Sequence, residues 1–229
     1  MKNKPLKLHL GCGKHYLDGY VNVDLPSERQ KLMRARADIY KDIRDLEYSD
    51  NSVDEIRNHH LLEHFTRQEA LKLLLQWRRW LKPGGFLVIE TPDFEGSIKL
   101  FLNADLKTKF KLARHIFGSH ESDWAVHKDF WSKDKFGFIL NKLGFEIIEI
   151  KQFNSVLGKI PKTSPLIQKI PLLRIKNKLA DILPNILVRA KKIDKRINEK
   201  EVAREILSMS LVGSEKEILK IWLKQVFGS

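Results

Sequence analysis

Short apolar runs recur along the first 150 residues and are separated by turn-forming residues. Phe86–Thr91 is a continuous apolar run, as expected for a strand buried on both faces of a parallel sheet. Tyr20–Asp24 instead alternates and ends in an acid. Together the runs predict strands at Leu6–Leu10, Tyr20–Asp24, Ser52–Ile56, Phe86–Thr91, Phe145–Ile150 and Ile186–Ala190.

The clearest helix signal begins at Thr66, which forms a capping-box signature with Glu69. Residues 82–85, Lys-Pro-Gly-Gly, predict where this helix stops. Between these signals the apolar residues have helical spacing, at Ala70, Leu73, Leu74, Trp77 and Leu81.

Two later helices are predicted from their caps. Ser132 is the expected N-cap of one that closes at Gly144, and Ser214 with Glu217 is expected to open the last. Trp222 in the last helix is expected either to serve an interface or to pack in the core. Strands alternating with helices predict an α/β sandwich with a mainly parallel sheet.

Charge is unevenly distributed along the 229 residues, which carry 42 Lys and Arg against 29 Asp and Glu, a net charge of +13. Residues 155–229 contain 16 of these basic and 7 of these acidic residues, so they hold +9 of the total. The single cysteine, Cys12, excludes an internal disulfide and a cysteine-cluster metal site, and no metal ligands are predicted. No apolar run is long enough to span a membrane or resembles a secretory signal, so a cytoplasmic location is expected.

The turn after the first strand has the features of a nucleoside-binding site. Gly11 and Gly13 allow close approach of the backbone to a ligand, and Asp24 ends the next strand, where it can accept from a ribose diol. A dinucleotide fingerprint fits less well, because its third glycine position is Tyr16 and the acid comes early. A P-loop is excluded, since Lys14 is followed by His15. A plain strand turn remains the alternative.

Three segments in order, 8–24, 42–65 and 81–94, resemble the class I S-adenosylmethionine-dependent methyltransferases, most closely the type 11 methyltransferase-domain group. The resemblance covers about residues 6–151. It implies a Rossmann-like three-layer sandwich with a mainly parallel seven-stranded sheet whose last strand is antiparallel. The short segment between Gly13 and Asp24 implies a short first helix.

The same resemblance implies S-adenosyl-L-methionine as cofactor and assigns its contacts. The turn would face the methionine part and Asp24 the ribose, while Asp42 would accept from the adenine amino group. The loop after the fourth strand would line the pocket near the methyl group. The cofactor-binding residues implied in this way are Gly11, Cys12, Gly13, Asp24, Asp42, Ile43, Asn58 and His59.

Methyl transfer to a hydroxyl also requires removal of a proton, for which His59, His60, Asp93 and His127 are the catalytic candidates. Most of the eight histidines are nevertheless expected to serve packing or the surface. Glu63 and His64 are expected to form a structural hydrogen-bonded pair before the Thr66 helix. Cys12 is interpreted as a small packing residue and not as a nucleophile.

The basic C-terminal part suggests what the acceptor or partner could be. Residues 1–192 are predicted to form the methyltransferase domain, with 155–185 as a basic insertion between its last two strands and 193–229 as a helical extension. Residues 159–192 are read as a lid for an anionic acceptor, as an amphipathic contact with an anionic membrane, or as a solvated face. Nucleic acid is not expected as partner, because no aromatic residue lies between Phe153 and Trp222.

These observations predict a methyltransferase acting on a small-molecule or glycan acceptor, saccharide-like and anionic, with oxygen as the favoured target. The Asn58-His59-His60-Leu61 stretch stands where the resembled enzymes that methylate exocyclic amines have Asn-Pro-Pro-Tyr. An RNA or protein methyltransferase and a non-catalytic regulator that binds S-adenosylmethionine remain the alternatives.

Overall fold

A seven-stranded sheet organises the chain, which we describe from a computed structural model covering residues 4–29, 34–156 and 182–228. The strand order is β3-β2-β1-β4-β5-β7-β6. All pairs are parallel except those of β7, which runs antiparallel to both β5 and β6. The strands are β1 (Lys7–Leu10), β2 (Val21–Asp24), β3 (Ile39–Tyr40), β4 (Val53–His59), β5 (Leu81–Pro92), β6 (Phe145–Val156) and β7 (Ile182–Lys192).

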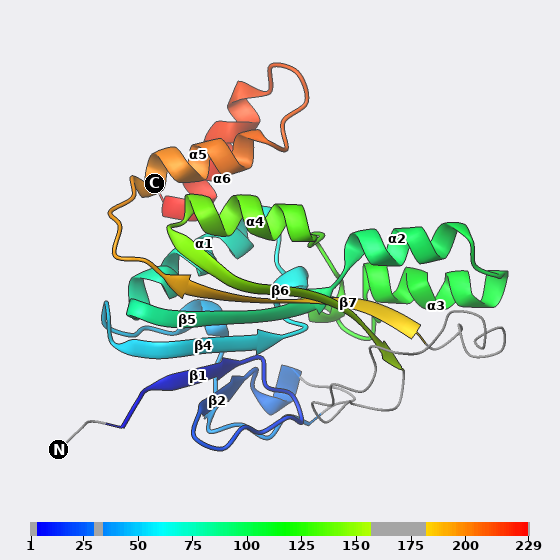
Figure 1. Cartoon of the computed structure of the whole chain (residues 1–229), viewed down its shortest axis with the longest axis horizontal. Helices are drawn as coiled ribbons and strands as arrows, with labels where there is room; N and C mark the ends of the chain where they lie inside the picture. The colour runs from blue at the N-terminus through cyan, green and yellow to red at the C-terminus, as the bar shows by residue number, and fades with distance from the viewer. Residues whose placement is uncertain (1–3, 30–33, 157–181, 229) are drawn as a thin grey trace.

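The predicted architecture is confirmed by this topology, including the antiparallel last strand. Six strands match the predicted runs: β1 and β2 are one residue shorter than predicted, and the other four extend beyond the predicted runs. The strand β3 was not predicted because two residues carry no periodic signal. The helices are α1 (Arg67–Trp80), α2 (Phe94–Leu102), α3 (Leu106–Phe117), α4 (Lys133–Lys142), α5 (Glu199–Ser208) and α6 (Lys216–Phe227). In Figure 1, α1, α4, α5 and α6 lie together over one face of the sheet, and α2 and α3 lie side by side near the start of β7.

The predicted caps of α1 and α4 are present. Thr66 accepts from the Glu69 backbone at 3.3 Å while the Glu69 carboxylate accepts from the Thr66 backbone at 3.0 Å. Ser132 accepts from the Lys135 backbone at 3.3 Å, and Gly144 adopts a φ of +71° after α4. The predicted cap of α6 is wrong: Glu215, not Ser214, precedes the helix, and its side chain makes no cap hydrogen bond.

The short helix expected between Gly13 and Asp24 is also absent from this described segment, which forms turns instead. Asn22 explains how the segment is held. Its side-chain oxygen accepts from the Leu17 backbone at 2.9 Å and its amide donates to the Leu17 carbonyl at 3.0 Å. One buried side chain therefore satisfies backbone groups that a helix would have paired.

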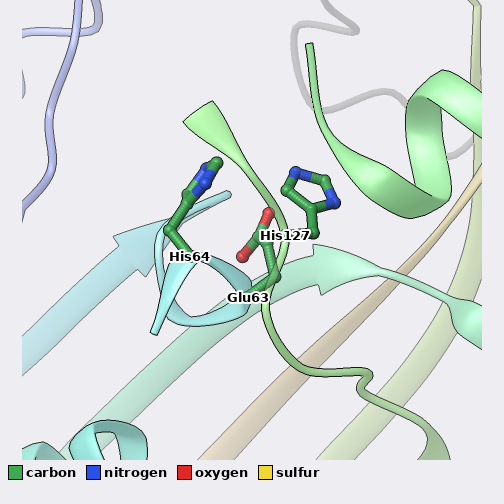
Figure 2. A group of neighbouring side chains, drawn as sticks. All are labelled: Glu63, His64 and His127. Carbon is green, nitrogen blue, oxygen red and sulfur yellow. The ribbon is translucent and has the colours of Figure 1, made fainter. Parts of the chain in front are cut away.

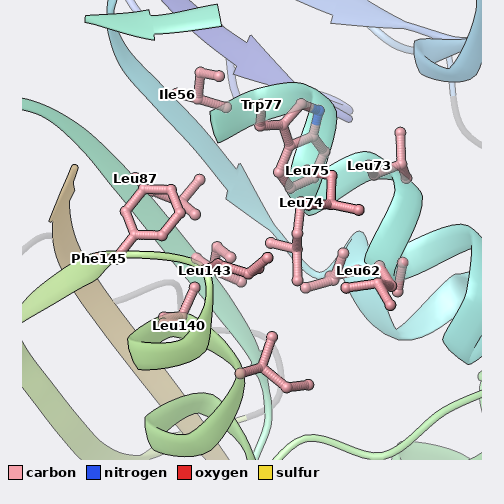
Figure 3. Close-up of a cluster of buried hydrophobic side chains, with 14 of the residues drawn as sticks. Ile56, Leu62, Leu73, Leu74, Leu75, Trp77, Leu87, Leu140, Leu143 and Phe145 are labelled. Atoms are coloured by element: carbon pink, nitrogen blue, oxygen red, sulfur yellow. The ribbon is translucent and has the colours of Figure 1, made fainter. Parts of the chain in front are cut away.

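The core lies between the sheet and the helices of the covered face. Figure 3 shows Trp77 and Leu74 of α1 facing Leu87 of β5 and Phe145 of β6, all buried. The C-terminal helices join this core, since Ala203 of α5 is fully buried. Trp222 packs against the core and lies under the Arg67 guanidinium, 5.1 Å from its ring centre, so the core-packing alternative describes this residue.

The boundary predicted at residue 192 stays a prediction, although the extension shares the core of the domain. Residues 157–181, which include most of the basic insertion, lie outside the described residues, so the lid and membrane interpretations of 159–192 stay predictions as well. Within the described ranges, no helix combines the length and apolar character needed to cross a bilayer.

Candidate active site

The glycine turn and the acid of β2 meet at the carboxyl ends of β1 and β2, as predicted. Gly11 and Gly13 adopt φ angles of +65° and +54°, which L side chains rarely take. Asp24 accepts from the Gly13 backbone at 2.6 Å and from the Leu25 backbone at 2.7 Å. The carboxylate therefore holds the turn in place and sits at the usual ligand-binding edge of a parallel sheet.

Cys12 lies between these glycines with only 1% of its surface exposed. Its thiol donates to the Arg36 carbonyl at 3.3 Å. Burial, together with the nearby Asp24 carboxylate, raises the pKa of Cys12 to about 12. The side chain remains a thiol at neutral pH, in line with a packing role and not with nucleophilic chemistry.

Asp42 caps the 3₁₀ turn Ile43–Asp45 and is already surrounded by donors. It accepts from the Arg44 backbone at 3.1 Å and forms ion pairs with Arg44 at 2.7 Å and Arg29 at 3.0 Å. Ile43 beside it is buried. The predicted contact of Asp42 with adenine would require the exposed Arg29 to give way, because a carboxylate offers about four acceptor sites.

Acid titration tests whether the ion pairs with Arg44 and Arg29 hold Asp42 in this position. The Arg44 hydrogen bonds lower the pKa of Asp42 to about 2, against the opposing effect of burial. The stabilisation by a carboxylate with a lowered pKa is complete above about pH 4 and is lost as the pH falls towards 2. Asp42→Asn is expected to cost about 1–2 kcal/mol of unfolding free energy at neutral pH, given the exposure of both arginines.

Urea unfolding of the wild type and Asp42→Asn between pH 7 and pH 2 measures the difference. The free energies of unfolding of the two proteins should converge as the pH approaches 2. A difference that stays constant down to pH 2 would contradict the ion pairing of Asp42. Asp45→Asn is the matched control, because Asp45 is exposed in the same turn.

The stretch Asn58-His59-His60 was predicted to line one pocket, but the structure sends its side chains in different directions. Asn58 is fully buried, and its amide oxygen and nitrogen have no hydrogen-bond partner among the described residues. Successive strand residues face opposite sides of a sheet, so His59 packs edge-on against His9 on the other face. Burial lowers the pKa of His59 to about 4, and its Nδ1 lies 3.5 Å from Glu90.

His60 follows β4 with a φ of +49° and sits between two carboxylates. Its Nδ1 is 3.3 Å from Glu63 and its Nε2 is 3.6 Å from Glu90. Burial acts to lower its pKa, but the nearby carboxylates of Glu63 and Glu90 prevail and raise the pKa to about 10. His60 is therefore an imidazolium at neutral pH, a donor that is not suited to accept a proton.

A cleft of about 490 Å³ lies next to His60, between α3 and the loop that follows it. Its wall includes His127 from the predicted set and side chains that sequence reasoning missed, notably Lys111 and Arg114 of α3, and Trp124. Helical spacing did not reveal α3 because several of its large apolar residues face outward: Leu106, Phe110 and Phe117 are 72%, 71% and 58% exposed.

Asp93, the remaining catalytic candidate, is buried at the start of α2 and does not line the cleft. One of its carboxylate oxygens accepts from Gln152 at 2.7 Å. Its backbone nitrogen donates to the Pro184 carbonyl at 2.9 Å, the same oxygen that His115 contacts at 2.8 Å. Asp93 thus joins α2 to the last two strands.

His127 is the candidate best placed to accept a proton at neutral pH. Burial lowers its pKa, which outweighs the opposite effect of Glu63, so the ring is neutral at pH 7. Figure 2 shows the Glu63 carboxylate between His127 and His64. The expected pair of Glu63 with His64 is not formed: Glu63 contacts His60, and His64 Nδ1 contacts the Val126 carbonyl at 3.3 Å.

Residues 8–89 match a family model described as a methyltransferase domain. Residues 8–89 therefore form a methyltransferase domain of the S-adenosylmethionine-dependent class. The matched range contains the glycine turn, Asp24 and all of β4. No protein of curated function matches this methyltransferase.

Solved structures of other methyltransferases share the fold. An S-adenosylmethionine-dependent methyltransferase from Archaeoglobus fulgidus has 19% identity and a TM-score of 0.50, covering 83% of this chain and 87% of its own. One from Mesorhizobium loti has 17% identity and a TM-score of 0.50, covering 82% and 91%. One from Methanosarcina mazei has 15% identity and a TM-score of 0.50, covering 85% and 95%.

S-adenosyl-L-methionine is the cofactor of this methyltransferase, and the residues at the sheet edge fit it. Asp24 lies beside a turn with two left-handed glycines, and Asn58 near the end of β4 has a buried amide that no described residue pairs. An unpaired buried amide is costly, so a polar ligand at this edge would satisfy it. Which residue contacts which part of the cofactor stays a prediction.

Proposed function

We propose that this methyltransferase transfers its methyl group to an oxygen of a small, saccharide-like and anionic acceptor bound in the cleft beside His60. The single observation that carries the proposal is the charge of the cleft wall. Lys111 and Arg114 line it, the charge of His60 is balanced by Glu63 and Glu90, and Glu121 is the acidic residue among the lining residues that the structure describes. An anion is the ligand that such a wall attracts.

Trp124 adds a flat apolar surface to the charged wall. Its ring nitrogen donates to the Arg29 carbonyl at 2.9 Å, which fixes the indole in the loop after α3. A cleft with one aromatic face and the cations of Lys111 and Arg114 suits a polar ring with a negative group better than an apolar substrate. This combination favours a saccharide-like acceptor.

The sulfonium of bound S-adenosylmethionine supplies an electrophilic methyl group. The chain has to orient the acceptor for in-line displacement and, for a hydroxyl acceptor, take up its proton. The neutral His127 ring lines the cleft and is suited to accept that proton, whereas His60 can only donate a hydrogen bond. Oxygen remains the favoured target, because His127 could serve a hydroxyl acceptor and a carboxylate acceptor would need no base.

Methyl-labelled S-adenosylmethionine tests the acceptor class. The full chain should label a uronic acid or a phosphorylated sugar and should leave the matched neutral sugars unlabelled. Labelling of RNA or of protein, with strong dependence on salt, would replace the proposal with the corresponding alternative. Binding of S-adenosylhomocysteine without transfer to any of these acceptors would favour a regulator.

Arg114→Gln measures the contribution of the charged wall. We expect KM for the anionic acceptor to rise about tenfold with kcat within about twofold, since one charge-assisted hydrogen bond at an exposed side chain is lost from ground state and transition state alike. Lys107→Gln is the matched control, because Lys107 is exposed on the same helix but does not line the cleft. Equal effects of the two substitutions would show that overall charge, and not the cleft, attracts the acceptor.

A further inference from the structure

A buried carboxylate and two histidines meet at the base of the cleft. Glu63 comes from the 3₁₀ turn Leu62–His64 after β4, and His127 comes from the loop after α3, which is 63 residues further along the chain than His64. One ligand atom from each of the three residues lies within 4.8 Å of the others. In Figure 2 the Glu63 carboxylate lies between the two imidazole rings.

The Glu63 carboxylate has one charged neighbour, His60, and is otherwise without a close polar partner among the described residues. It is 2% exposed, and neither of its oxygens has a hydrogen-bond partner of good geometry among the described residues. His60 approaches one oxygen at 3.3 Å, and the carboxylate lies between the rings of His64 and His127 (Figure 2). Burial of a carboxylate is costly unless it is paired or coordinates a metal ion.

The ring of His64 is held by a backbone carbonyl, as metal-binding histidines commonly are. His64 Nδ1 lies 3.3 Å from the Val126 carbonyl, and because a carbonyl can only accept, this nitrogen carries the hydrogen. The other nitrogen then keeps a lone pair that can bind an ion. The backbone of His127 is held as well, because its nitrogen donates to the Phe117 carbonyl.

The backbone around the three side chains is fixed by long-range hydrogen bonds. The His127 nitrogen donates to the Phe117 carbonyl at 3.0 Å, and the Lys128 nitrogen donates to the Glu63 carbonyl at 2.8 Å. The second bond joins the segment of Glu63 directly to that of His127. The ligand atoms of a zinc ion at about 2.0–2.2 Å lie about 3–4 Å apart, so small rotations of these side chains would close the site.

We propose that Glu63, His64 and His127 bind a divalent transition-metal ion of the zinc type. Two histidines and one glutamate form a ligand set that binds zinc with an open fourth position. Because His64 and His127 also line the cleft, the open position would face the space in which the acceptor is proposed to bind. No metal ligands were predicted from sequence, since the three residues are brought together only by the loop after α3.

Ion binding itself does not depend on the proposed acceptor; only a role of the ion in holding an acceptor oxygen rests on that proposal. The ion would use the His127 lone pair that could otherwise accept a proton, so a metal-ligand role and a base role for His127 exclude one another. Metal binding measured without any acceptor therefore tests the site independently of the proposed reaction.

Titration of the full chain with Zn²⁺ and with Co²⁺ as a spectroscopic probe, after treatment with a chelator, tests the site. We expect one ion per chain, visible d–d absorption of bound Co²⁺, and a rise in Tm of roughly 5 °C at a hundredfold excess over Kd. Glu63→Gln and His127→Gln should each weaken binding at least about a hundredfold, because each removes one of three ligands.

His120→Gln is the matched control, since His120 is exposed in the same loop and contacts the Phe117 carbonyl at 2.9 Å without belonging to the cluster. Its ion affinity should equal that of the wild type. Binding of S-adenosylhomocysteine by each variant shows that it is folded. The proposal is overturned if the wild type takes up no stoichiometric ion, or if both Glu63→Gln and His127→Gln bind as tightly as the wild type.

Discussion

Asp24→Ala is expected to weaken binding of S-adenosylhomocysteine by at least about a hundredfold. The Asp24 carboxylate accepts from the Gly13 and Leu25 backbones at 2.6 and 2.7 Å, so its removal releases the glycine turn. It would also remove the predicted bonds to the ribose hydroxyls. Hydrogen bonds to a charged group contribute about 1.5–3 kcal/mol each, and two of them amount to more than a hundredfold in Kd.

Isothermal titration calorimetry with the full chain measures the Kd of S-adenosylhomocysteine for the wild type and for Asp24→Ala. Asp18→Ala is the matched control, because Asp18 is exposed in the same connection between β1 and β2 and should leave Kd unchanged. An unchanged Kd in Asp24→Ala would remove Asp24 from the cofactor site. Absence of binding to the wild type would instead contradict cofactor use by this chain.

Gly118→Ala is expected to lower Tm by roughly 5–10 °C and to abolish acceptor binding in the cleft. Gly118 has a φ of +93°, and an added Cβ would overlap the Ala125 carbonyl oxygen and lie 3.0 Å from the His127 backbone nitrogen. Both contacts are with backbone, so no side-chain rotation relieves them. Displacement of this loop would move His127 and Trp124 together, at a cost of about 2–4 kcal/mol.

Gly213→Ala is the control that distinguishes the effect of steric overlap on Tm from the effect of backbone strain. Gly213 also has a positive φ, of +63°, but no atom lies within 4 Å of an added Cβ. Its Tm should fall by roughly 2–4 °C, the effect of about 1 kcal/mol of strain. Thermal unfolding and S-adenosylhomocysteine binding should be measured on both variants. Equal melting temperatures for the two would show that the loop after α3 adapts to the added methyl group.

Local sequence signals predicted the elements that are stabilised by local interactions. The capping box at Thr66 and the glycine after α4 are properties of a few adjacent residues, and both are present. The short first helix was implied by the resemblance and not by such a local signal. Asn22 pairs the Leu17 backbone across the connection between β1 and β2, so the expected short helix does not form.

The residues of the candidate site also fall into two groups, those that the strand pattern places and those that depend on the tertiary structure. Gly11, Gly13 and Asp24 meet because adjacent parallel strands bring their carboxyl ends to one edge, a consequence of the strand pattern alone. Asn58 and His59 separate because the end of β4 continues as a strand, in which neighbouring side chains face opposite sides. Their joint role near the methyl group could not be judged before the strand boundary was known.

By itself, the sequence determined that this chain is an α/β protein with a glycine turn after the first strand and an acid at the end of the second, because strand periodicity, glycine turns and caps act over a few residues. Only the tertiary structure decided the protonation of His60, the placement of Arg114 in a cleft, and the meeting of Glu63 with His127. Charge state depends on burial and on neighbours that the fold supplies. For these residues the neighbours come from segments up to 67 positions apart, as between His60 and His127, which no local pattern records.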